Sequence, residues 1–195
     1  MQLKRKKDYL KIRKMISISP QEVIVDPVLS VYDNLFVYGL ILGVPKNLLK
    51  QRIDYFLERV NLKEKRNRLA LHLSEGEMRR LQIVRALLKE EASVFFIDEP
   101  TIRLDPIGKK ITWDEFKKLK KKDKVIFLAS NDMGEVEKLC DEIIFINNGK
   151  VIFQGEVEET KRLFAPDEVV EIEIEKELDS TKFDELKKTF YLIKY

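Results

Sequence analysis

The apolar residues of the chain fall into short runs, and the spacing within each run indicates a different secondary structure. Residues 94–97 and 125–128 are wholly apolar and rich in β-branched and aromatic side chains. Such runs are typical of strands buried on both faces of a parallel sheet. Between them, a Lys-rich stretch around residues 113–121 has helical spacing. Strand, helix and strand in this order predict a βαβ crossover and an α/β fold.

Further helices are predicted upstream of the first strand run. Apolar residues recur at mixed helical spacing over 28–44, and after Pro45 one face of residues 46–62 is apolar. Another helix is expected after Ser74, with its body over 78–89. The reason is that a hydroxyl at the N-cap and Glu77 three residues later match a capping box.

The C-terminal third of the chain is rich in β patterns. A short helix over 135–139 precedes two apolar runs, 143–146 and 151–153, which Asn147-Asn-Gly149 separates as in a hairpin. Residues 169–174 alternate apolar and acidic side chains, which predicts a half-exposed strand. We expect a main domain over 1–160 and a small C-terminal β appendage over 161–195.

Composition narrows the class of protein. With 195 residues, 44% of them hydrophobic, the chain can bury one sizeable core. A net charge of +3 does not indicate nucleic-acid binding, and the basic runs 4–7 and 117–124 suit solvated surfaces. The longest apolar stretch, 35–44, is too short to span a bilayer, and the first residues do not resemble a signal peptide. We therefore expect a cytoplasmic protein that reaches a membrane only through a partner.

Two segments have residues suited to phosphate chemistry. The strand 94–97 ends in the adjacent carboxylates Asp98 and Glu99, an arrangement that can hold Mg²⁺ on nucleotide phosphates and orient or deprotonate the attacking water. Upstream, Ser74 and Gly76 open a basic helix whose free N–H groups suit a terminal phosphate. Taken separately, each segment has a plainer interpretation: a strand exiting into solvent, and an ordinary N-cap.

Together these segments resemble the ABC ATPase family, in which a signature motif, a Walker B strand, a D-loop and a switch residue follow one another at about these spacings. The resemblance runs from about Ile12 to Gly155, and the segment 17–22 resembles the Q-loop of the family. It implies an incomplete P-loop NTPase fold with parallel core strands and a helical subdomain at about 28–92. The sequences of residues 139–141 and 149–155 most resemble those of ABC-2-type exporter subunits.

The resemblance also implies a set of site residues, with ATP and Mg²⁺ as cofactors of a completed site. Glu99 and Asn131 would be catalytic, and Asp98 and Gln21 would hold the metal. The nucleotide would contact four residues: Gln21, Ser74, Gly76 and Asp105.

The sequence contains no Walker A loop, which needs two glycines five positions apart followed by Lys and Ser or Thr. Of the two Gly-Lys pairs, the one at Gly108 has Arg103 where the first glycine belongs, and the one at Gly149 has Ile144 there. We expect the phosphate loop to come from a partner chain, and the chain to be inactive as an ATPase by itself.

Three positions depart from the family pattern. Asn131 stands where the family has histidine, and an amide can hydrogen-bond to a phosphate but cannot carry a proton. Glu75 introduces a carboxylate into the signature, and Arg103 replaces a small residue before the D-loop. His72, the sole histidine, precedes the signature and cannot fill the switch position.

The leading hypothesis is therefore an ATP-binding-cassette subunit that couples ATP hydrolysis to transport only together with other chains. Its expected partners are a transmembrane transporter subunit and an ATP-binding subunit or N-terminal half that carries Walker A. The alternative is a non-catalytic, pseudo-ATPase subunit that regulates or assembles a transporter. The Gln21 loop disfavours a third class, the chromosome-maintenance and DNA-repair ATPases.

Overall fold

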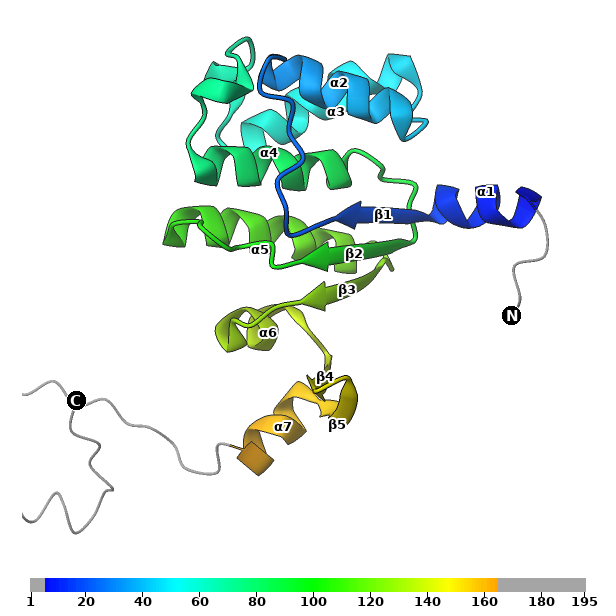
Figure 1. The fold of residues 1–195 in the computed structure, drawn as a ribbon, viewed down its shortest axis with the longest axis vertical. Helices are drawn as coiled ribbons and strands as arrows, with labels where there is room; N and C mark the ends of the chain where they lie inside the picture. Colours follow the sequence, from blue (N-terminus) through cyan, green and yellow to red (C-terminus); the bar gives the residue numbers. More distant parts are fainter. Residues whose placement is uncertain (1–5, 165–195) are drawn as a thin grey trace, which may run out of the picture. The chain divides into compact units, whose positions relative to one another are not determined.

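The computed structural model describes residues 6–164 of the chain (Figure 1). The backbone divides into two compact units, residues 1–157 and 158–195. The first holds nearly all of the described elements. In the second, only the end of helix α7 (Val157–Phe164) is described. The strand predicted over 169–174, and with it the appendage from residue 165 onward, lies outside the described residues.

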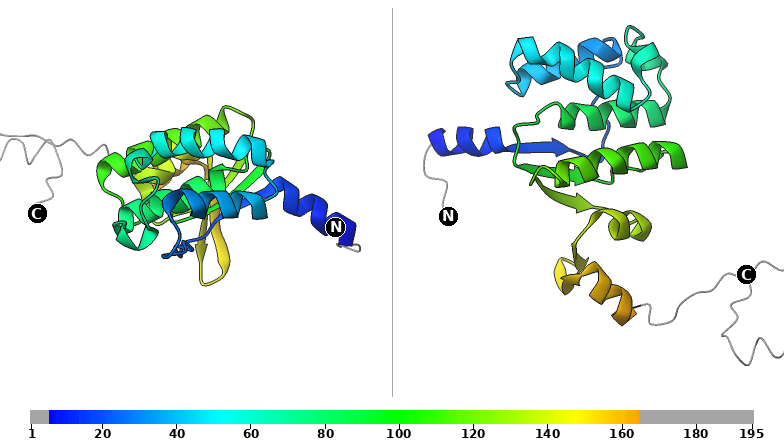
Figure 2. Two further views of the ribbon diagram at one scale, coloured as in Figure 1. Left: turned by 90° about the horizontal axis from the view of Figure 1, so that it is seen from above. Right: turned by 180° about the vertical axis from the view of Figure 1, so that it is seen from behind.

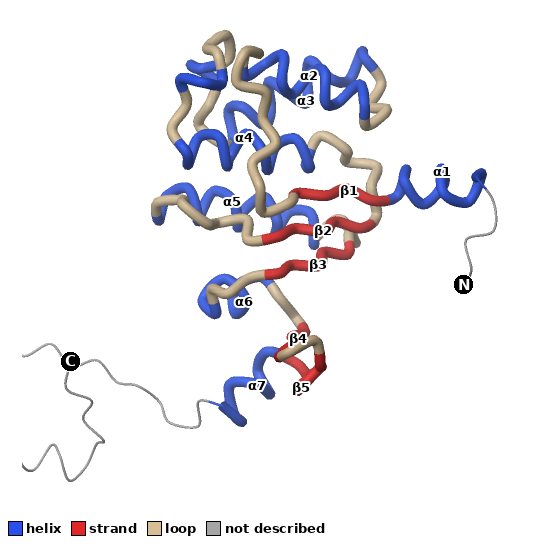
Figure 3. The backbone as a smooth tube through the Cα atoms, in the orientation of Figure 1, coloured by secondary structure: helices blue, strands red, loops and turns tan. Residues whose placement is uncertain are grey.

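Three short parallel strands form the central sheet. They are β1 (Ile16–Ser19), β2 (Val94–Asp98) and β3 (Val125–Ala129), in the spatial order β1-β2-β3. Figure 3 shows them in red, side by side. The pairing places Ile18 opposite Phe96, and Phe96 opposite Phe127. The predicted α/β fold and the βαβ crossover are thus confirmed.

All α-helices of the first unit except α1 (Lys6–Met15) fall on or overlap segments that the sequence predicted to be helical. Those predicted upstream of β2 are α2 (Val31–Ile41), α3 (Lys46–Arg59) and α4 (Glu75–Leu87). The capping box of Ser74 and Glu77 is present at the start of α4. The remaining helices in the first unit are α1 (Lys6–Met15), α5 (Pro106–Lys120) and α6 (Met133–Leu139), with 3₁₀ turns at Lys63–Lys65 and Ala70–His72.

One face of the sheet packs against α4 and α5 (Figure 2). The Ser17 hydroxyl donates to the carbonyl oxygen of Ala86 in α4 at 2.8 Å, which ties β1 to that helix. Both helices lie on the same face because two right-handed crossovers that advance in one direction across a sheet stay on one side of it. The core continues between α2, α3 and α4 through fully buried apolar side chains: Val31, Leu35, Leu49, Ile53, Leu81 and Val84.

The prediction that these strands are buried on both faces is wrong for the described chain. Phe95 and Ile97 are buried against the helices, whereas Phe96 between them is 40% exposed. Val125 and Phe127 of β3 are 52% and 55% exposed. The cause is the crossover geometry, since the helices between the three strands cover one face only.

Strands β4 (Glu142–Asn147) and β5 (Lys150–Glu156) form the predicted antiparallel hairpin. Asn148 and Gly149 connect them with φ values of +47° and +72°, as a type I′ turn requires. Val136, Ile143 and Val157 form a small core beneath it. Among residues 6–164, no helix combines the length and the apolar character needed to cross a bilayer.

Candidate functional site

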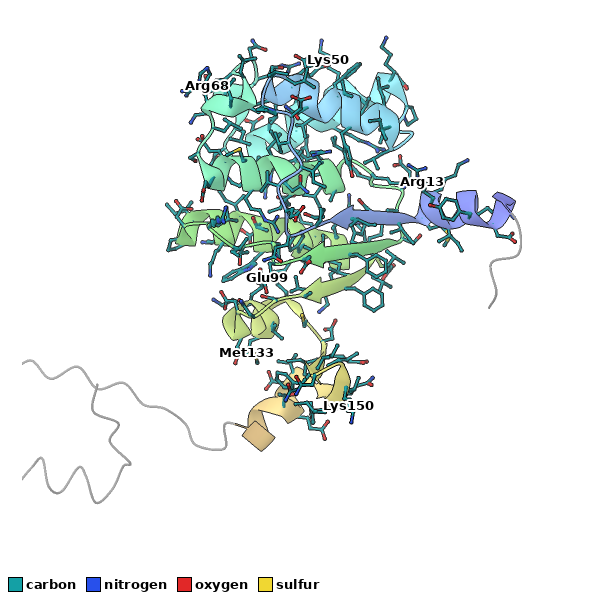
Figure 4. All side chains as sticks on the ribbon, viewed as in Figure 1. Arg13, Lys50, Arg68, Glu99, Met133 and Lys150 are labelled. Atoms are coloured by element: carbon teal, nitrogen blue, oxygen red, sulfur yellow. The ribbon has the colours of Figure 1, made fainter. Side chains whose placement is uncertain are left out.

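The carboxyl ends of the three parallel strands lie at one edge of the sheet, where α/β proteins commonly bind ligands. The chain leaves β1 towards Gln21, β2 towards Glu99, and β3 towards Asn131. Figure 4 places Glu99 at this edge, on the same side as Met133 at the start of α6. The fold therefore brings three of the predicted site segments to one edge, although they are far apart in sequence.

A buried arginine in α4 joins two of these segments. Arg79 is 1% exposed, and its guanidinium donates to five backbone carbonyl oxygens. The acceptors lie in the loop after β1, at the last residue of β2 and in the loop after β2: Pro20 (2.9 Å), Gln21 (2.9 Å), Asp98 (2.6 Å), Glu99 (2.7 Å) and Pro100 (3.1 Å). Burial lowers the pKa of Arg79, and the nearby carboxylates act in the opposite direction. One cation thus fixes both loops to the helix that the signature motif opens.

The sequence analysis did not identify this role of Arg79. A signal was available, because Arg79 lies at helical spacing from Ile83 and Ala86, which are buried on the core-facing side of α4. An arginine on the apolar face of a helix needs a full set of acceptors, since a buried charge without partners is costly. Sequence spacing could not reveal which carbonyls supply them.

The two acidic residues after β2 differ in position. Asp98 is exposed and ends the strand on the same face as Phe96, two residues earlier. Glu99 has a φ of +45°, a left-handed conformation that costs a non-glycine residue about 1–3 kcal/mol. Its N–H donates to the carbonyl oxygen of Ala129 at 2.8 Å, and its own carbonyl accepts from Arg79. These two hydrogen bonds hold the strained turn at the predicted catalytic carboxylate.

Helix-capping hydrogen bonds between neighbouring residues determine most of the conformation of the signature segment. The Ser74 side chain accepts from the Glu77 N–H at 3.3 Å, and the Glu77 carboxylate accepts from the Ser74 N–H at 3.0 Å. Glu77 also pairs with Lys65. Burial opposes ionisation of Glu77, but the hydrogen bonds from Lys65 and Ser74 bring its pKa below the usual value.

Close packing explains why residue 76 is a glycine. A Cβ atom at Gly76 would lie 3.3 Å from the carbonyl oxygen of Arg103 and 3.7 Å from the Leu104 side chain. The Arg103 guanidinium lies 3.6 Å from the Glu75 carboxylate, with both side chains mostly exposed, so this ion pair adds little stability. Gly76 therefore lets the loop before α5 approach the first turn of α4.

A cavity of about 500 Å³ lies between the Q-loop segment, the first turns of α4 and the loop before α5. Its lining includes Gln21 and Glu75 together with Arg103. Asp98, Glu99 and Asn131 do not line it. The predicted site residues thus fall into two groups, one around this cavity and one along the carboxyl edge of β2 and β3.

Both neighbours of Asn131 are held in place, while Asn131 itself is exposed. The Ser130 hydroxyl donates to the fully buried Glu135 carboxylate at 2.7 Å, and the Trp113 indole donates to the same carboxylate at 3.0 Å. Asp132 caps α6 by accepting from the Glu135 N–H. Glu135 is a supporting residue that sequence reasoning missed, because its buried environment comes from α5.

Two capping carboxylates complete this side of the site. The Lys109 ammonium donates to Asp132 at 2.6 Å, and this hydrogen bond lowers the pKa of Asp132. Asp105 is the N-cap of α5 and accepts from the Gly108 N–H at 2.7 Å. The predicted D-loop carboxylate therefore has a clear helix-capping role in this chain.

The donor set of the carboxyl edge suits a Mg²⁺ ion held jointly with phosphates. No group of three or more His, Cys, Asp or Glu side chains able to hold a metal occurs in the part of the chain that the structure describes. Mg²⁺ on a nucleotide needs only one or two protein ligands, with phosphates and water supplying the rest. The exposed Asp98 and the amide of Gln21 match that demand.

Comparison with known proteins identifies the family. The model of the ABC transporter family matches residues 2–102. The chain is 35% identical to the Nod factor export ATP-binding protein I of Ralstonia nicotianae over 147 residues, which is 75% of this chain and 46% of that protein. For the protein of the same name from Burkholderia lata the identity is 32% over 162 residues, covering 83% of this chain and 50% of that one. The chain thus spans about half the length of these curated relatives.

A solved structure supports the same assignment at the level of the fold. It is described as the ATP binding subunit of an ABC transporter, and it superimposes with a TM-score of 0.73 at 23% identity. The match covers 83% of this chain and 67% of the other. The family match, the curated relatives and the fold of this solved structure all agree, and the chain belongs to the ABC transporter family of ATP-binding proteins.

Proposed function

We propose that the chain is an ATP-binding-cassette subunit of a membrane transporter that couples ATP hydrolysis to transport only with a partner chain carrying Walker A. The observation that carries this proposal is the set of contacts made by Arg79. Its guanidinium joins the backbones of Gln21 and Glu99 to the helix that begins at Ser74. These hydrogen bonds fix the two loops relative to α4, and so they position the groups that must act together on one nucleotide site.

Each residue has a chemical task in this proposal. Asp98 and Gln21 would hold Mg²⁺, which would neutralise the charge of the nucleotide phosphates. Glu99 orients or deprotonates the attacking water. Asp105 contacts the nucleotide through the carboxylate oxygen that does not cap α5.

The N-terminus of α4 serves a second ATP molecule in this proposal. Ser74 and Gly76 present the first turn of α4 to the terminal phosphate bound by the partner. The separation of Glu75, which lines the cavity, from the Asp98 edge supports a division of labour between two chains. In that arrangement each chain completes a site on the other.

A non-catalytic role is the second candidate. Asn131 cannot carry a proton, and its exposed amide is flanked by the fixed residues Ser130 and Asp132. A subunit with this switch position would bind a partner and nucleotide while hydrolysing slowly. It would then regulate or assemble the transporter.

The relatives favour export as the direction of transport, because they are named export ATP-binding proteins. We infer a location in the cytoplasm, at the inner face of the membrane through a transmembrane subunit. Neither nucleic acid nor direct insertion into the bilayer has a part in this proposal.

The test is a titration with a fluorescent ATP analogue and Mg²⁺, with the chain alone and then mixed with a Walker A-bearing ABC subunit. We expect tight binding and hydrolysis above that of the partner alone only in the mixture, and Glu99→Gln should keep binding while removing the added hydrolysis. Binding without added hydrolysis would support the non-catalytic role. Tight binding by the chain alone, or no change on mixing, would contradict the proposal.

A further inference from the structure

An ion pair joins the beginnings of α5 and α6 at the carboxyl edge of the sheet. The Lys109 ammonium lies 2.6 Å from the Asp132 carboxylate. Helix α5 follows the carboxyl end of β2 and α6 follows that of β3, so both partners belong to the edge where the parallel strands end. Asp132 is also the residue directly after Asn131. A cation is thus held beside the switch position, where the amide of Asn131 carries no charge.

Hydrogen bonds on both helices fix this ion pair. The Lys109 N–H donates to the carbonyl oxygen of Asp105 at 2.9 Å, which anchors its backbone in the first turn of α5. One carboxylate oxygen of Asp132 accepts from the Glu135 N–H at 3.2 Å, and the Asp132 N–H donates to the Ser130 hydroxyl oxygen at 3.1 Å. The other carboxylate oxygen accepts from the ammonium. Asp132 therefore holds Lys109 in one orientation.

The Lys109 ammonium retains donors for a ligand. An ammonium group has three N–H donors, and within residues 6–164 the structure gives it one side-chain acceptor, the Asp132 carboxylate. The Lys109 side chain is 32% exposed, so its other donors can reach a bound anion. Arg79 differs, because it is buried and its guanidinium donates to five carbonyl oxygens. Of these two cations, only Lys109 is available to a ligand.

The negative charge of this edge makes such a cation necessary for phosphate binding. Asp98 is exposed, Glu99 follows it, and Asp132 and the buried Glu135 add two further carboxylates. These carboxylates repel a phosphate at short range. An ammonium that donates hydrogen bonds to phosphate oxygens offsets this repulsion. Because Asp132 already orients the Lys109 side chain, binding costs less conformational entropy.

We propose that Lys109, oriented by Asp132, is a phosphate-binding residue that places a positive charge beside Asn131 at the nucleotide site. This inference rests on the proposed function and adds a residue to the same site. The ammonium keeps its proton and acts only electrostatically, by stabilising negative charge on the phosphate oxygens during transfer. A lysine of α5 thus supplies a charge that the amide of Asn131 cannot carry.

The test measures phosphate binding by the chain alone, without nucleotide. Sodium tripolyphosphate is titrated into the isotope-labelled chain, and the resonances of the Trp113 indole N–H and the Asn131 side-chain amide are followed by NMR. Trp113 lies one turn after Lys109 on α5, and its indole donates to Glu135 beside the ion pair. We expect weak but saturable shifts of both resonances, because one cation provides only part of the affinity of a complete site.

Matched variants separate phosphate binding from a structural ion pair. Lys109→Met removes the charge and should weaken the affinity for tripolyphosphate by about fivefold or more, whereas Lys109→Arg should retain most of it. Asp132→Asn removes a negative charge and keeps an oxygen that can cap α6, so the affinity should not fall. Lys110→Met, at the exposed next position of α5, controls for a general loss of positive charge and should leave the affinity unchanged.

Three outcomes would overturn the inference. They are the absence of saturable shifts in the unmodified chain, equal affinities of Lys109→Met and Lys110→Met, and an equal loss of affinity in Lys109→Met and Asp132→Asn. The last result would mean that the ion pair acts only on the structure. Urea unfolding of each variant establishes that it is folded, and Lys109→Gln replaces Lys109→Met if that variant is unstable.

Phosphate binding and the proposed function can fail separately. Tripolyphosphate affinity that depends on Lys109, with no ATP hydrolysis in the mixture with a Walker A-bearing subunit, would retain the inference and contradict the catalytic proposal. Conversely, ATP hydrolysis in that mixture with a kcat that Lys109→Met leaves unchanged would retain the function and contradict the role of Lys109.

Discussion

The Nη2 atom of Arg79 donates a hydrogen bond of 2.7 Å to the carbonyl oxygen of Glu99, the residue whose backbone is held at a positive φ. Through this bond, a buried side chain of α4 supports the strained turn that follows β2. The same guanidinium holds the Q-loop backbone at Gln21. Movement of α4 would therefore displace both loops.

Replacing Arg79 should destabilise the protein strongly. Arg79→Met leaves five backbone carbonyls without their donor, and we expect a loss of about 3 kcal/mol or more in the free energy of unfolding. Arg79→Lys keeps the charge but not the planar fork of donors, so it should recover only part of this loss. Urea unfolding of both variants measures the effect.

Arg80 provides the matched control, because it is the next residue of α4, is only partly buried and has an Nε atom without a hydrogen-bond partner. We expect Arg80→Met to cost about 1 kcal/mol or less. Similar losses in the free energy of unfolding for Arg79→Met and Arg80→Met would mean that the hydrogen bonds from Arg79 to the carbonyls add no measurable stability.

Glu77 should make the stability of the protein sensitive to acid. Its pKa is lowered in the folded state, so its contribution is fully present above the pKa of an unfolded glutamate, about 4.3, and is lost as the pH falls through the folded pKa. Glu77→Gln should cost about 1 kcal/mol at pH 7 and progressively less as the pH falls through the folded pKa of Glu77. Unfolding curves of both proteins across this range test the prediction, and a difference that persists in acid would contradict it.

Asn131→His should restore a titrating group at the switch position. In the mixture with a Walker A-bearing subunit, we expect kcat for ATP hydrolysis to rise by about tenfold or more. The rate should also acquire a pH dependence near the imidazole pKa, about 6.5. Asn131→Gln is the control, since it keeps the amide. Equal rates for the two variants across the pH range would rule out this role for position 131.

Glu135 should govern the environment of Trp113, the only tryptophan of the chain. Glu135→Leu removes the acceptor of both the Ser130 hydroxyl and the Trp113 indole N–H, so we expect a loss of about 2 kcal/mol in stability. The single indole N–H resonance should shift and exchange faster with solvent. Asp114→Asn, at an exposed position beside Trp113, serves as control. An unchanged indole resonance in Glu135→Leu would show that the hydrogen bond is absent in solution.

Local patterns in the sequence determined the secondary structure and several site segments. The capping box at Ser74 and Glu77 and the Asn148-Gly149 turn were predictable because the atoms that interact are at most a few residues apart. The apolar runs of β2 and β3 were predictable for the same reason, since their composition alone favours strands. The order of the motifs then indicated the family.

Only the tertiary structure decided which groups meet across the chain. Arg79 reaches acceptors 19 to 59 residues away, and the acceptor role of Glu135 depends on a tryptophan 22 residues earlier. The burial of Phe96 depends on which face the crossover helices take, and residue spacing does not encode that choice. Local hydrogen bonds and periodicity can be predicted from the sequence, because the residues involved are close together in it. The partners of a buried charge and the sheet face that helices cover depend instead on how distant segments pack.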